Sequence, residues 1–597
     1  MGKSDSGEGK DSKLVAGYTT TKLADWYKRN KQTTIGMGAF AILILGVVVP
    51  LIYHSFAAGG SSAIEPENGN ISSAITRGND TNASGGGYIQ FGGTPVSGSA
   101  LTVNANTVVG NFDARMKGIS MGNWTFNFGN AYIGQITNLK QAMQAINPGI
   151  IRYAGGLKGN YMGFDRNAKT PLFDTAWTFN GQTYQERYGT DELASLNSFA
   201  VGLGMTVMIQ VNVSNNDPSM WADLVRYAKE QNWTSFKYYE FSNELDLVSA
   251  DGESAAITPA TYGTRVAAFE NAMLAVDPTI SFVGGVPSAA TDIVLNNYAS
   301  GGNVPSQYIT QSVLSSHNAG HDLTAISFHW YQNNNDPAPA SVFRWTNNQT
   351  PSSGNFWQQS YSRQWSEQIG PFLRSKAVSS YPNTQIGISE LGEDSGTSVS
   401  NSNHIGALWY SDVLGRLAYN GINWATNWNS FAGQDEWYSL MYPSNGSASA
   451  TINVRPSYYA YLMYNKYFGN QMVQSGSYDQ SKISIWASKD TNDPGKLKLR
   501  ITNVTGTALT VPINMTGFSA TSGGAYTLSS TNPLDTSNSS PLSGAPEAIN
   551  GVKINGNSVA TSLASITPTT VNASGNSFNY TVPAYSSVAI VLSGTFQ

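Results

Sequence analysis

Short apolar runs alternate with helical patterns between residues 115 and 468. The runs cover residues 118–121, 149–153, 205–211, 238–241, 280–283, 323–328, 385–389 and 422–425, and helical patterns include residues 136–146, 218–231, 259–276 and 357–377. Eight buried strands that alternate with helices over about 350 residues are typical of a (β/α)8 barrel. The sequence therefore predicts an α/β fold with a TIM barrel over residues 115–468.

The pattern changes after Phe468. Residues 469–597 contain strands of alternating hydrophobicity, such as KISIWAS and KLKLRITNV, separated by Gly, Ser and Asn turns. This pattern predicts a C-terminal β-sandwich domain. Residues 88–114 are also strand-like and are candidates for pairing with that sandwich.

A long apolar segment lies close to the N-terminus. No charge occurs between Thr33 and Tyr53, and about 20 residues at 1.5 Å each cross the hydrocarbon layer of a bilayer. Four basic residues between positions 22 and 31 favour a cytoplasmic side for the tail formed by residues 1–32. We expect a single-pass transmembrane helix at residues 33–53 in the cell membrane, with the catalytic domain extracellular.

Two further observations bear on this anchor. A cleaved signal peptide is the alternative, with Ser55-Phe56-Ala57 as its small-residue cleavage site. The apolar region of a signal peptide is usually about 7–15 residues long, which is shorter than the segment at residues 33–53. Residues 54–87 are rich in Gly, Ser and Asn and bury little apolar surface, so they are expected to form a flexible linker.

Composition excludes several classes of function. The chain has 597 residues, a formal net charge of -5, only 12% charged residues and no cysteine. The absence of cysteine excludes a disulfide scaffold, thiol catalysis and Cys-ligated metals. A charge-poor, slightly acidic chain has no basic stripe for a phosphate backbone, so no nucleic-acid partner is expected. Its polar, uncharged surface suits an acidic exterior.

No cofactor or metal is expected either. No Gly-rich phosphate loop follows a predicted strand, which argues against a nucleotide cofactor. His317 and His321 have the i,i+4 spacing of zinc ligands on a helix. However, no Glu follows His317 as the HExxH motif requires, and Gly320 weakens a helix there.

The ends of the predicted strands carry side chains suited to sugar chemistry, and catalytic residues of β/α barrels lie at these ends. The second strand ends with Arg152, the fourth with Asn243 and Glu244, the sixth with His329 and Tyr331, the seventh with Glu390 and the eighth with Trp428. Glycosidic cleavage needs one carboxyl group that is protonated and one that is ionised. Arg152 and Tyr331 can keep Glu390 charged by hydrogen bonding, while Glu244 beside Asn243 can remain the acid.

Other residues near these strand ends have competing interpretations. Trp330, His329 and Trp428 are candidates for sugar contacts, and Asn212, after the third strand, is included among the substrate-binding residues. Trp424 is expected in the barrel core. Glu240 is either structural, paired to Arg152, or a substrate ligand, whereas Glu393 and Asp394 are expected as solvated loop acids.

The same residues carry a family resemblance. The run EFSNELD resembles the strand-4 signature of the clan A retaining glycoside hydrolases, and ISELGE resembles their strand-7 nucleophile. IRYAGG resembles the Arg-x-Pro-Gly-Gly turn of families 39, 51 and 79, and FHWY resembles the end of their sixth strand. The resemblance covers about residues 115–597. It implies that Glu244 is the acid/base, Glu390 the nucleophile, Asn243 the ligand of the sugar 2-hydroxyl, and Arg152 and Tyr331 partners of the nucleophile.

The chain departs from the family pattern at three points. Ala154 stands where Pro follows Arg-x, and Leu245 stands where Pro follows Asn-Glu. The two glutamates, at positions 244 and 390, are 146 residues apart, which is longer than usual. Residues 331–355 are the candidate insertion, as a long loop over the cleft.

The sequence thus predicts a membrane-anchored retaining glycoside hydrolase that cleaves O-glycosidic bonds of plant-type or envelope oligo- or polysaccharides by double displacement. Within this class, endo-β-glucanase action and exo-action on a pentoside or glucuronide remain open, and the scarcity of basic residues at strand ends favours an uncharged sugar. The alternative from another class is a non-catalytic carbohydrate-binding or cell-envelope surface protein built on a barrel.

Overall fold

The computed structural model describes most of the chain beyond residue 99. The described residues are 75–79, 87–91, 100–122, 132–136, 138–179, 181–247, 257–290, 305–332, 342–346, 362–394, 403–433, 438–444, 451–534 and 547–597. The chain divides into two compact units, residues 1–92 and 93–597. Within the first unit, β1 (Ile75–Asn79) and β2 (Gly87–Phe91) form an antiparallel pair.

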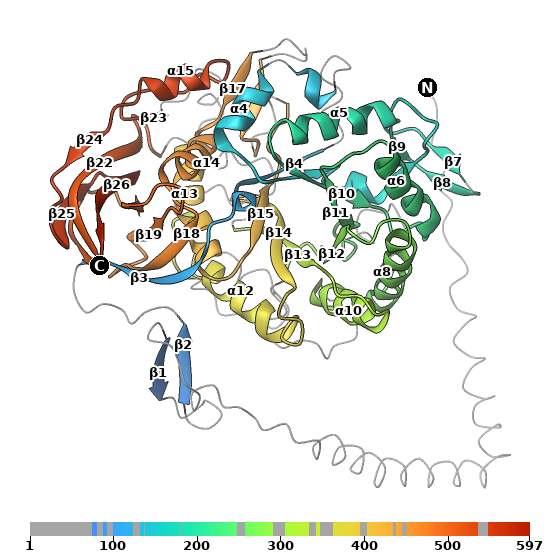
Figure 1. Ribbon diagram of the computed structural model, residues 1–597, viewed down its shortest axis with the longest axis horizontal. Helices are drawn as coiled ribbons and strands as arrows, with labels where there is room; N and C mark the ends of the chain where they lie inside the picture. Colours follow the sequence, from blue (N-terminus) through green and yellow to red (C-terminus); the bar gives the residue numbers. More distant parts are fainter. Residues whose placement is uncertain are drawn as a thin grey trace, which may run out of the picture. The chain divides into compact units, whose positions relative to one another are not determined.

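The second unit contains a closed barrel of eight parallel strands, seen in Figure 1. In chain order the strands are β4 (Gly118–Met121), β5 (Ile150–Tyr153), β10 (Thr206–Val211), β11 (Phe236–Phe241), β12 (Ser281–Gly285), β13 (Ala325–Tyr331), β14 (Gln385–Gly392) and β15 (Trp424–Asn427). Neighbours along the chain pair in order, and β15 pairs with β4 to close the ring. Each strand overlaps one predicted apolar run, so the predicted barrel is confirmed.

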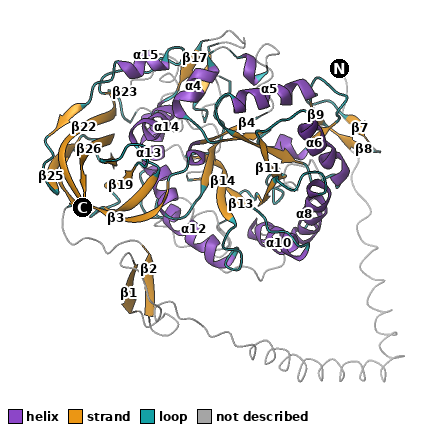
Figure 2. Ribbon diagram, in the orientation of Figure 1, coloured by secondary structure: helices purple, strands orange, loops and turns teal. Residues whose placement is uncertain are grey.

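Helices connect the strands on the outside of the barrel (Figure 2). They are α4 (Leu139–Ile146), α5 (Thr190–Val201), α6 (Pro218–Glu230), α8 (Pro259–Leu274), α10 (Pro305–Asn318), α12 (Trp365–Lys376) and α13 (His404–Tyr419). Two of them begin with a capping residue followed by Pro, which is favourable because the first helical N–H needs no partner. Asp217 accepts a hydrogen bond from Met220 N (3.2 Å), and Thr258 accepts one from Thr261 N (3.2 Å).

The predicted helix at 357–377 begins later than expected. Residues 357–361 lie outside the described part of the chain, and residues 362–364 form a turn before α12. The hydroxyl of Ser362 accepts a hydrogen bond from Trp365 N (3.2 Å), which stabilises this turn ahead of the first helical residue.

A domain made mostly of sheet follows the barrel. Its ten strands are β3 (Leu101–Asn111), β18 (Gln471–Gly476), β19 (Ile483–Lys489), β20 (Lys496–Asn503), β21 (Leu509–Thr516), β22 (Phe518–Ser530), β23 (Glu547–Ile549), β24 (Thr569–Val571), β25 (Ser577–Val582) and β26 (Ser586–Phe596). They pair in the order β23-β22-β26-β20-β19-β18-β3-β21-β25, with β24 beside β22. Strands β22 and β26, near one end of this path, share an apolar core with β21 and β25 at the other end, so the sheet folds over itself.

Strand β3 belongs to this sheet although it precedes the barrel in the chain. It is antiparallel to β18 and parallel to β21, and it links the two parts of the sheet. Strand β2, which covers part of the same predicted strand-like region, pairs with β1.

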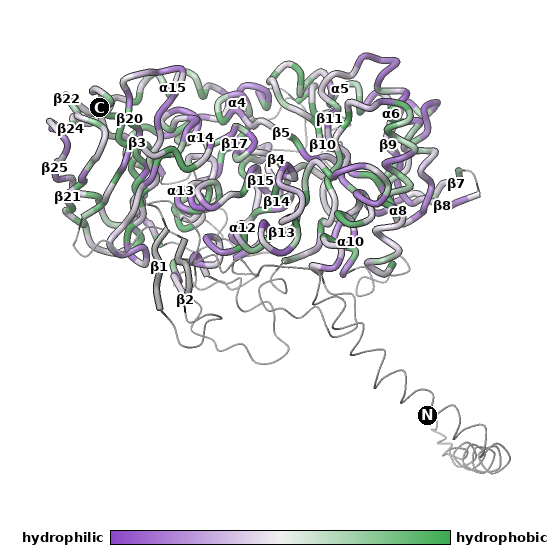
Figure 3. Tube along the Cα trace, turned by 60° about the horizontal axis from the view of Figure 1, so that its bottom comes forward, coloured by the Kyte–Doolittle hydropathy of each residue, from purple (hydrophilic) through white to green (hydrophobic). Residues whose placement is uncertain are grey.

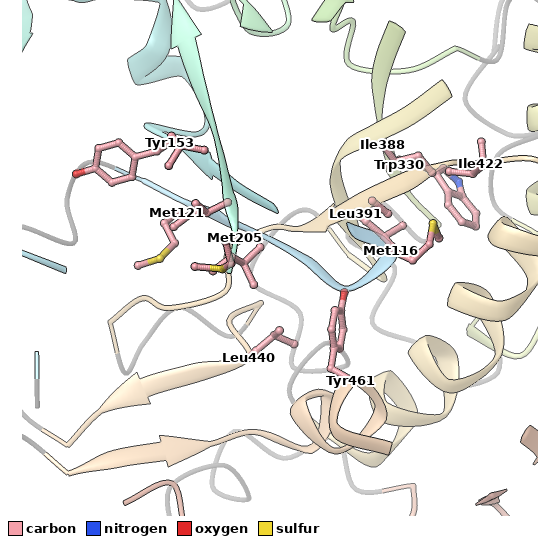
Figure 4. Packing of buried hydrophobic residues seen from close by; sticks show 14 of the residues in the cluster. Met116, Met121, Tyr153, Met205, Trp330, Ile388, Leu391, Ile422, Leu440 and Tyr461 are labelled. Carbon is pink, nitrogen blue, oxygen red and sulfur yellow. The ribbon is translucent and has the colours of Figure 1, made fainter. Parts of the chain in front are cut away.

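The barrel and the sheet share a continuous apolar core. It combines barrel strands with α14 (Pro456–Tyr467) and with Trp486 of β19. Figure 4 shows part of this core, with Leu391 of β14 and Tyr461 of α14 among the labelled residues. In Figure 3, polar and apolar residues alternate along α6, whose apolar side is buried, while β7 (Trp177–Phe179) and β8 (Gln182–Tyr184) form a hairpin at the edge of this unit.

Among the described ranges, no helix is both long and apolar enough to cross a bilayer. The predicted anchor at 33–53, the tail at 1–32 and the linker at 54–74 lie outside those ranges, as do residues 80–86.

Candidate active site

Glu390 on β14 is held by two hydrogen-bond donors. Arg152 on β5 donates from Nη1 to Oε1 (2.7 Å), and the hydroxyl of Tyr331 on β13 donates to Oε2 (2.6 Å). The Glu390 side chain is only 6% exposed. Both oxygens of this buried carboxylate are therefore held in place, one by a charged donor and the other by a hydroxyl.

Arg152 is the centre of a buried polar network. Besides Glu390, it donates from Nε to Glu240 Oε2 (2.5 Å) and from Nη2 to Asn243 Oδ1 (2.7 Å), and its side chain is fully buried. Burial alone would lower the pKa of Arg152, but Glu240 and Glu390 outweigh it and raise that pKa. Arg152 therefore stays charged and fixes three side chains from β11 and β14 and the turn after β11.

Glu244 has a different environment from Glu390. It lies in the turn after β11, where Ser242 (φ 64°) and Glu244 itself (φ 41°) adopt left-handed backbone conformations. Such strain is found mainly where the surrounding structure enforces it, often at functional sites. The Glu244 N–H donates to Val286 O (2.9 Å), and the side chain is 17% exposed.

His329 lies between the two carboxylates. Its Nδ1 is 2.7 Å from Glu244 Oε1 and 3.4 Å from Glu390 Oε2, and its side chain is fully buried. Burial lowers the pKa of His329 to about 4, and the nearby Arg152 acts in the same direction. A neutral imidazole therefore separates the two acids over most of the pH range.

The two glutamates are close together. One oxygen of Glu244, one of Glu390 and a ring nitrogen of His329 all lie within 4.8 Å of one another. Retaining glycosidases have carboxyl groups about 5–5.5 Å apart, whereas inverting enzymes leave about 6.5–9.5 Å for a water molecule. The same three atoms are close enough to surround a cation, but Arg152 already supplies positive charge to Glu390, and hydrogen bonds account for the arrangement.

Asp246, two residues after Glu244, is a further acid at this end of the barrel. It accepts hydrogen bonds from Ser288 N (3.0 Å) and Ser288 Oγ (2.5 Å). Burial raises the pKa of Asp246 to about 7, and the charge of Glu244 adds to this effect. Asp246 is thus protonated in acid solution and adds no negative charge beside Glu244 there.

A pocket of about 460 Å³ opens onto both glutamates. Its lining residues are Gly156, Leu157, Lys158, Tyr161, Asp174, Gln185, Glu244, Tyr331, Glu390 and Trp428. The volume lies within the range of pockets that bind small molecules, about 300–1,000 Å³.

Trp428, after β15, reaches the pocket because two glycines lie against its ring. A Cβ atom on Gly155 would overlap the ring and the hydroxyl of Ser120, and one on Gly156 would lie 2.7 Å from the ring. Gly156 also has φ 82°, which L-residues rarely adopt. The Gly-Gly pair after β5 therefore positions an aromatic surface of the kind that stacks on sugars.

The structure places the remaining predicted residues as follows. Asn243 is buried beside Arg152, and His329 contacts the carboxylates rather than the pocket. Asn212 does not join the site. Its amide is buried, donates to Met162 O (3.2 Å) and accepts from Ser214 N (2.9 Å), so the backbone occupies its polar atoms.

The burial of three other residues bears on their expected roles. Trp424 lies in the barrel core, and Glu240 is a buried partner of Arg152. Trp330 is a core residue rather than a sugar contact, because it packs against Trp365 and Trp409.

Glu393 and Asp394 are not solvated loop acids. Both are buried, and they directly follow β14, which continues to Gly392. His317 and His321 do not share a helix, because α10 ends at Asn318.

One wall of the pocket was not predicted from the sequence. Lys158, Tyr161, Asp174 and Gln185 all come from residues 154–189, which connect β5 to α5. This segment contains no regular apolar period, and its strand β9 (Glu186–Tyr188) is short. Parts of the predicted loop at 331–355 lie outside the described residues.

The fold, an eight-stranded parallel barrel with a sheet domain, is shared with solved structures of glycoside hydrolases. A family 44 xyloglucanase of Paenibacillus polymyxa is 16% identical, with a TM-score of 0.56, and an α-L-arabinofuranosidase of Thermotoga maritima is 14% identical, with a TM-score of 0.58. Each comparison covers 83% of this chain and 99% of the other. A family 51 α-L-arabinofuranosidase of Thermotoga petrophila is 14% identical, with a TM-score of 0.57 over 82% of this chain and 99% of the other. No family model and no curated protein sequence matches the chain.

Proposed function

We propose that this protein is a retaining glycoside hydrolase that cleaves O-glycosidic bonds of neutral oligo- or polysaccharides. The observation that carries the proposal is the pair of carboxylates, with oxygens within 4.8 Å, in unlike environments at the end of a parallel barrel. Glu390 has two donors that favour its charge, whereas Glu244 is more exposed and has a neutral imidazole as its neighbour.

The proposed reaction has two steps. Glu390 attacks the anomeric carbon while Glu244 gives its proton to the departing oxygen, and a glycosyl-enzyme forms as the glycosidic bond breaks. Glu244, now ionised, takes a proton from water, and the resulting hydroxide attacks the anomeric carbon and releases Glu390. Arg152 and Tyr331 hold Glu390 in place through both steps.

The charges in the pocket favour a neutral sugar. Lys158 is the basic residue that lines it, and both Asp174 and Glu186 pair with Lys158, so this wall is not free to neutralise a uronate. The similar proteins are named as a xyloglucanase, a glucanase-xylanase and arabinofuranosidases. Neutral plant-type polysaccharides and arabinofuranosides are therefore the first substrates to test, and they separate endo-action from exo-action.

The test compares Glu390→Ala and Glu244→Ala with the unmodified protein on aryl glycosides and polysaccharides. We expect Glu390→Ala to lose activity on every substrate. Glu244→Ala should lose activity on polysaccharides but regain turnover of activated aryl glycosides when azide is added, because azide needs no general base. Glu230→Gln, an exposed residue on α6, is the control.

Product stereochemistry gives a second readout. The first-formed sugar should keep the anomeric configuration of the substrate, as measured by proton NMR during the reaction. Inversion, or full activity of Glu390→Ala, would contradict the mechanism. Polysaccharide binding without any hydrolysis by the unmodified protein would instead favour the non-catalytic alternative.

We also propose that residues 33–53 anchor the protein in the cell membrane, with the barrel extracellular. The support is the uncharged segment and the basic residues before it. Deletion of residues 33–53 should move the protein from the membrane fraction to the soluble fraction of expressing cells. An unmodified protein that is already soluble after fractionation would contradict the anchor.

A further inference from the structure

Lys158 and Asp174 form an ion pair on the pocket wall contributed by residues 154–189. The Asp174 side chain is 79% exposed and that of Lys158 is 35% exposed, so both are accessible to a ligand. Neither residue contacts Glu390 or Glu244 in a hydrogen bond or ion pair among the described residues, and the reaction proposed above does not use them. The pair is therefore a polar feature of the pocket without an assigned role.

The turn that carries Asp174 is fixed on both sides. Leu172 and Arg187 exchange two backbone hydrogen bonds, from Leu172 N to Arg187 O (3.0 Å) and from Arg187 N to Leu172 O (3.1 Å). Thr175 N donates to Gln185 O (3.0 Å). Asp174 itself has φ 47°, in the left-handed region. These bonds attach the turn to the segment that leads into β9, so the carboxylate is held over the pocket before any ligand binds.

Lys158 is held in place by a buried acid. Its Nζ lies 2.7 Å from Oε1 of Glu186, whose side chain is only 1% exposed, and it also contacts Asp174. The buried Glu186 positions the ammonium group, while the exposed Asp174 shares the pocket surface with it. With two acids and one base, this wall carries a net charge of -1, which disfavours a carboxylate-bearing sugar.

We propose that Lys158 and Asp174 form a sugar subsite that binds adjacent hydroxyl groups of a neutral sugar unit. The inference rests on the proposed glycosidase function and adds the second recognition element of its pocket. An ammonium group only donates hydrogen bonds and a carboxylate only accepts them, so the pair matches two neighbouring hydroxyls, of which one accepts and the other donates. The pocket volume of about 460 Å³ leaves room for more than the sugar that reacts.

The experiment measures KM and kcat of Asp174→Ala and Lys158→Met on xyloglucan, xylan and a one-sugar aryl glycoside, all with the full-length protein. We expect KM for the preferred polysaccharide to rise about tenfold with kcat within about twofold, because a lost hydrogen bond to a charged group affects ground state and transition state equally. KM for the aryl glycoside should change less than twofold. Lys482→Met and Asp479→Asn, which alter an exposed ion pair of the sheet domain, are matched controls.

Asp174→Ala is the decisive variant for loss of the carboxylate, and Asp174→Gly, which adopts φ 47° without strain, is measured beside it as the control for backbone strain. An unchanged polysaccharide KM in Asp174→Ala with an unchanged melting temperature would overturn the subsite. A fall of kcat on all substrates would also overturn it, since the pair would then act on the catalytic groups.

Affinity electrophoresis in gels that contain xyloglucan or xylan separates this inference from the proposed function. If the unmodified protein is retarded but hydrolyses nothing, the glycosidase proposal fails, while loss of retardation in Asp174→Ala still supports the subsite. If the protein hydrolyses a polysaccharide and both variants are retarded as strongly as the unmodified protein, the subsite fails and the glycosidase proposal stands.

Discussion

Arg152 and Tyr331 each donate a hydrogen bond to one carboxylate oxygen of Glu390. The arginine is shared with Glu240 and Asn243, so its removal would leave two buried acids without a counter-charge. The tyrosine hydroxyl, in contrast, makes its one described hydrogen bond to Glu390. Burial and the charge of Glu390 raise the pKa of Tyr331 well above its usual value, so the hydroxyl remains a donor at all relevant pH values.

Tyr331→Phe is therefore the cleanest probe of Glu390, the proposed nucleophile. We expect kcat to fall about 10- to 100-fold, because one hydrogen bond to a charged group contributes about 1.5–3 kcal/mol. The melting temperature should change little. Steady-state kinetics and thermal unfolding measure both effects.

Tyr458→Phe is the matched control, since this buried hydroxyl donates to Ala142 O (2.7 Å) and so links α14 to α4 rather than contacting the carboxylates. Equal kcat values for Tyr331→Phe and the unmodified protein would show that the hydroxyl does not support the nucleophile.

The ends of β5 and β15 meet at the pocket. The residues after β5 that make this contact are glycines, which have no side chain. Gly155 and Gly156 follow β5, and the ring of Trp428 after β15 lies directly against them. The Gly-Gly turn thus sets how far the aromatic surface extends towards the glutamates. The relation depends on two loops from strands that are not neighbours along the chain.

Gly155→Ala should displace the Trp428 ring, because the added methyl group cannot fit beside it. We expect KM to rise severalfold, and the tryptophan fluorescence to change on sugar binding less than in the unmodified protein. Gly110→Ala on β3, where the nearest atom is 3.7 Å from the new Cβ, is the control. A KM unchanged in Gly155→Ala would mean that Trp428 does not contact the substrate.

The type of secondary structure decides which parts of the fold and of the site could be predicted from the sequence. Buried parallel strands are short apolar runs in the sequence, so the eight strands were found, and each catalytic candidate followed from a strand end. Asn212 was misplaced because its strand end looks the same in sequence, although its amide binds the backbone of Met162. The wall with Lys158 and Asp174 depends on contacts within an irregular segment, which leave no periodic pattern.

At the scale of the whole molecule, a buried charge cluster joins the barrel to the sheet. Asp412 on α13 pairs with Arg363 (2.7 Å) and Arg416 (3.0 Å) and accepts a hydrogen bond from Trp486 Nε1 of the sheet (3.2 Å). Burial alone would raise the pKa of Asp412, but the two arginines outweigh it and hold that pKa far below its usual value. Both domains therefore depend on the same carboxylate.

Asp412→Ala should destabilise barrel and sheet together. Removal of one partner from a buried ionic cluster costs about 3–5 kcal/mol. We expect a single calorimetric transition at a lower temperature. Asp223→Asn, in a partly exposed pair on α6, should change stability by less than about 0.5 kcal/mol. Two separate transitions, with only one shifted, would show that the domains unfold independently.

Buried acids make stability depend on pH. Burial raises the pKa of Glu270 on α8 to about 8, although Ser316 Oγ donates to it (2.9 Å). Between its usual pKa and 8 the folded chain binds a proton that the unfolded chain releases, so this contribution is present in acid and is lost as pH rises towards 8.

Glu270→Gln should remove that contribution. The unmodified protein should lose stability from pH 5 to pH 8 by up to about 4 kcal/mol more than the variant, from about 1.4 kcal/mol for each pH unit. Chemical denaturation at both pH values measures the difference. Glu230→Gln on the exposed face of α6 is the control, because it makes the same substitution at an exposed glutamate. An identical pH dependence in Glu270→Gln would contradict the assignment.

The place of β3 in the sheet has a consequence for synthesis on the ribosome. Asn104 of β3 pairs with Gln474 of β18, 370 residues further along the chain. At about 5–20 residues per second, β3 leaves the ribosome about 20–70 seconds before that partner strand is made. During this interval the edge of β3 is unpaired, so the nascent chain is exposed to wrong strand pairing until translation is almost complete.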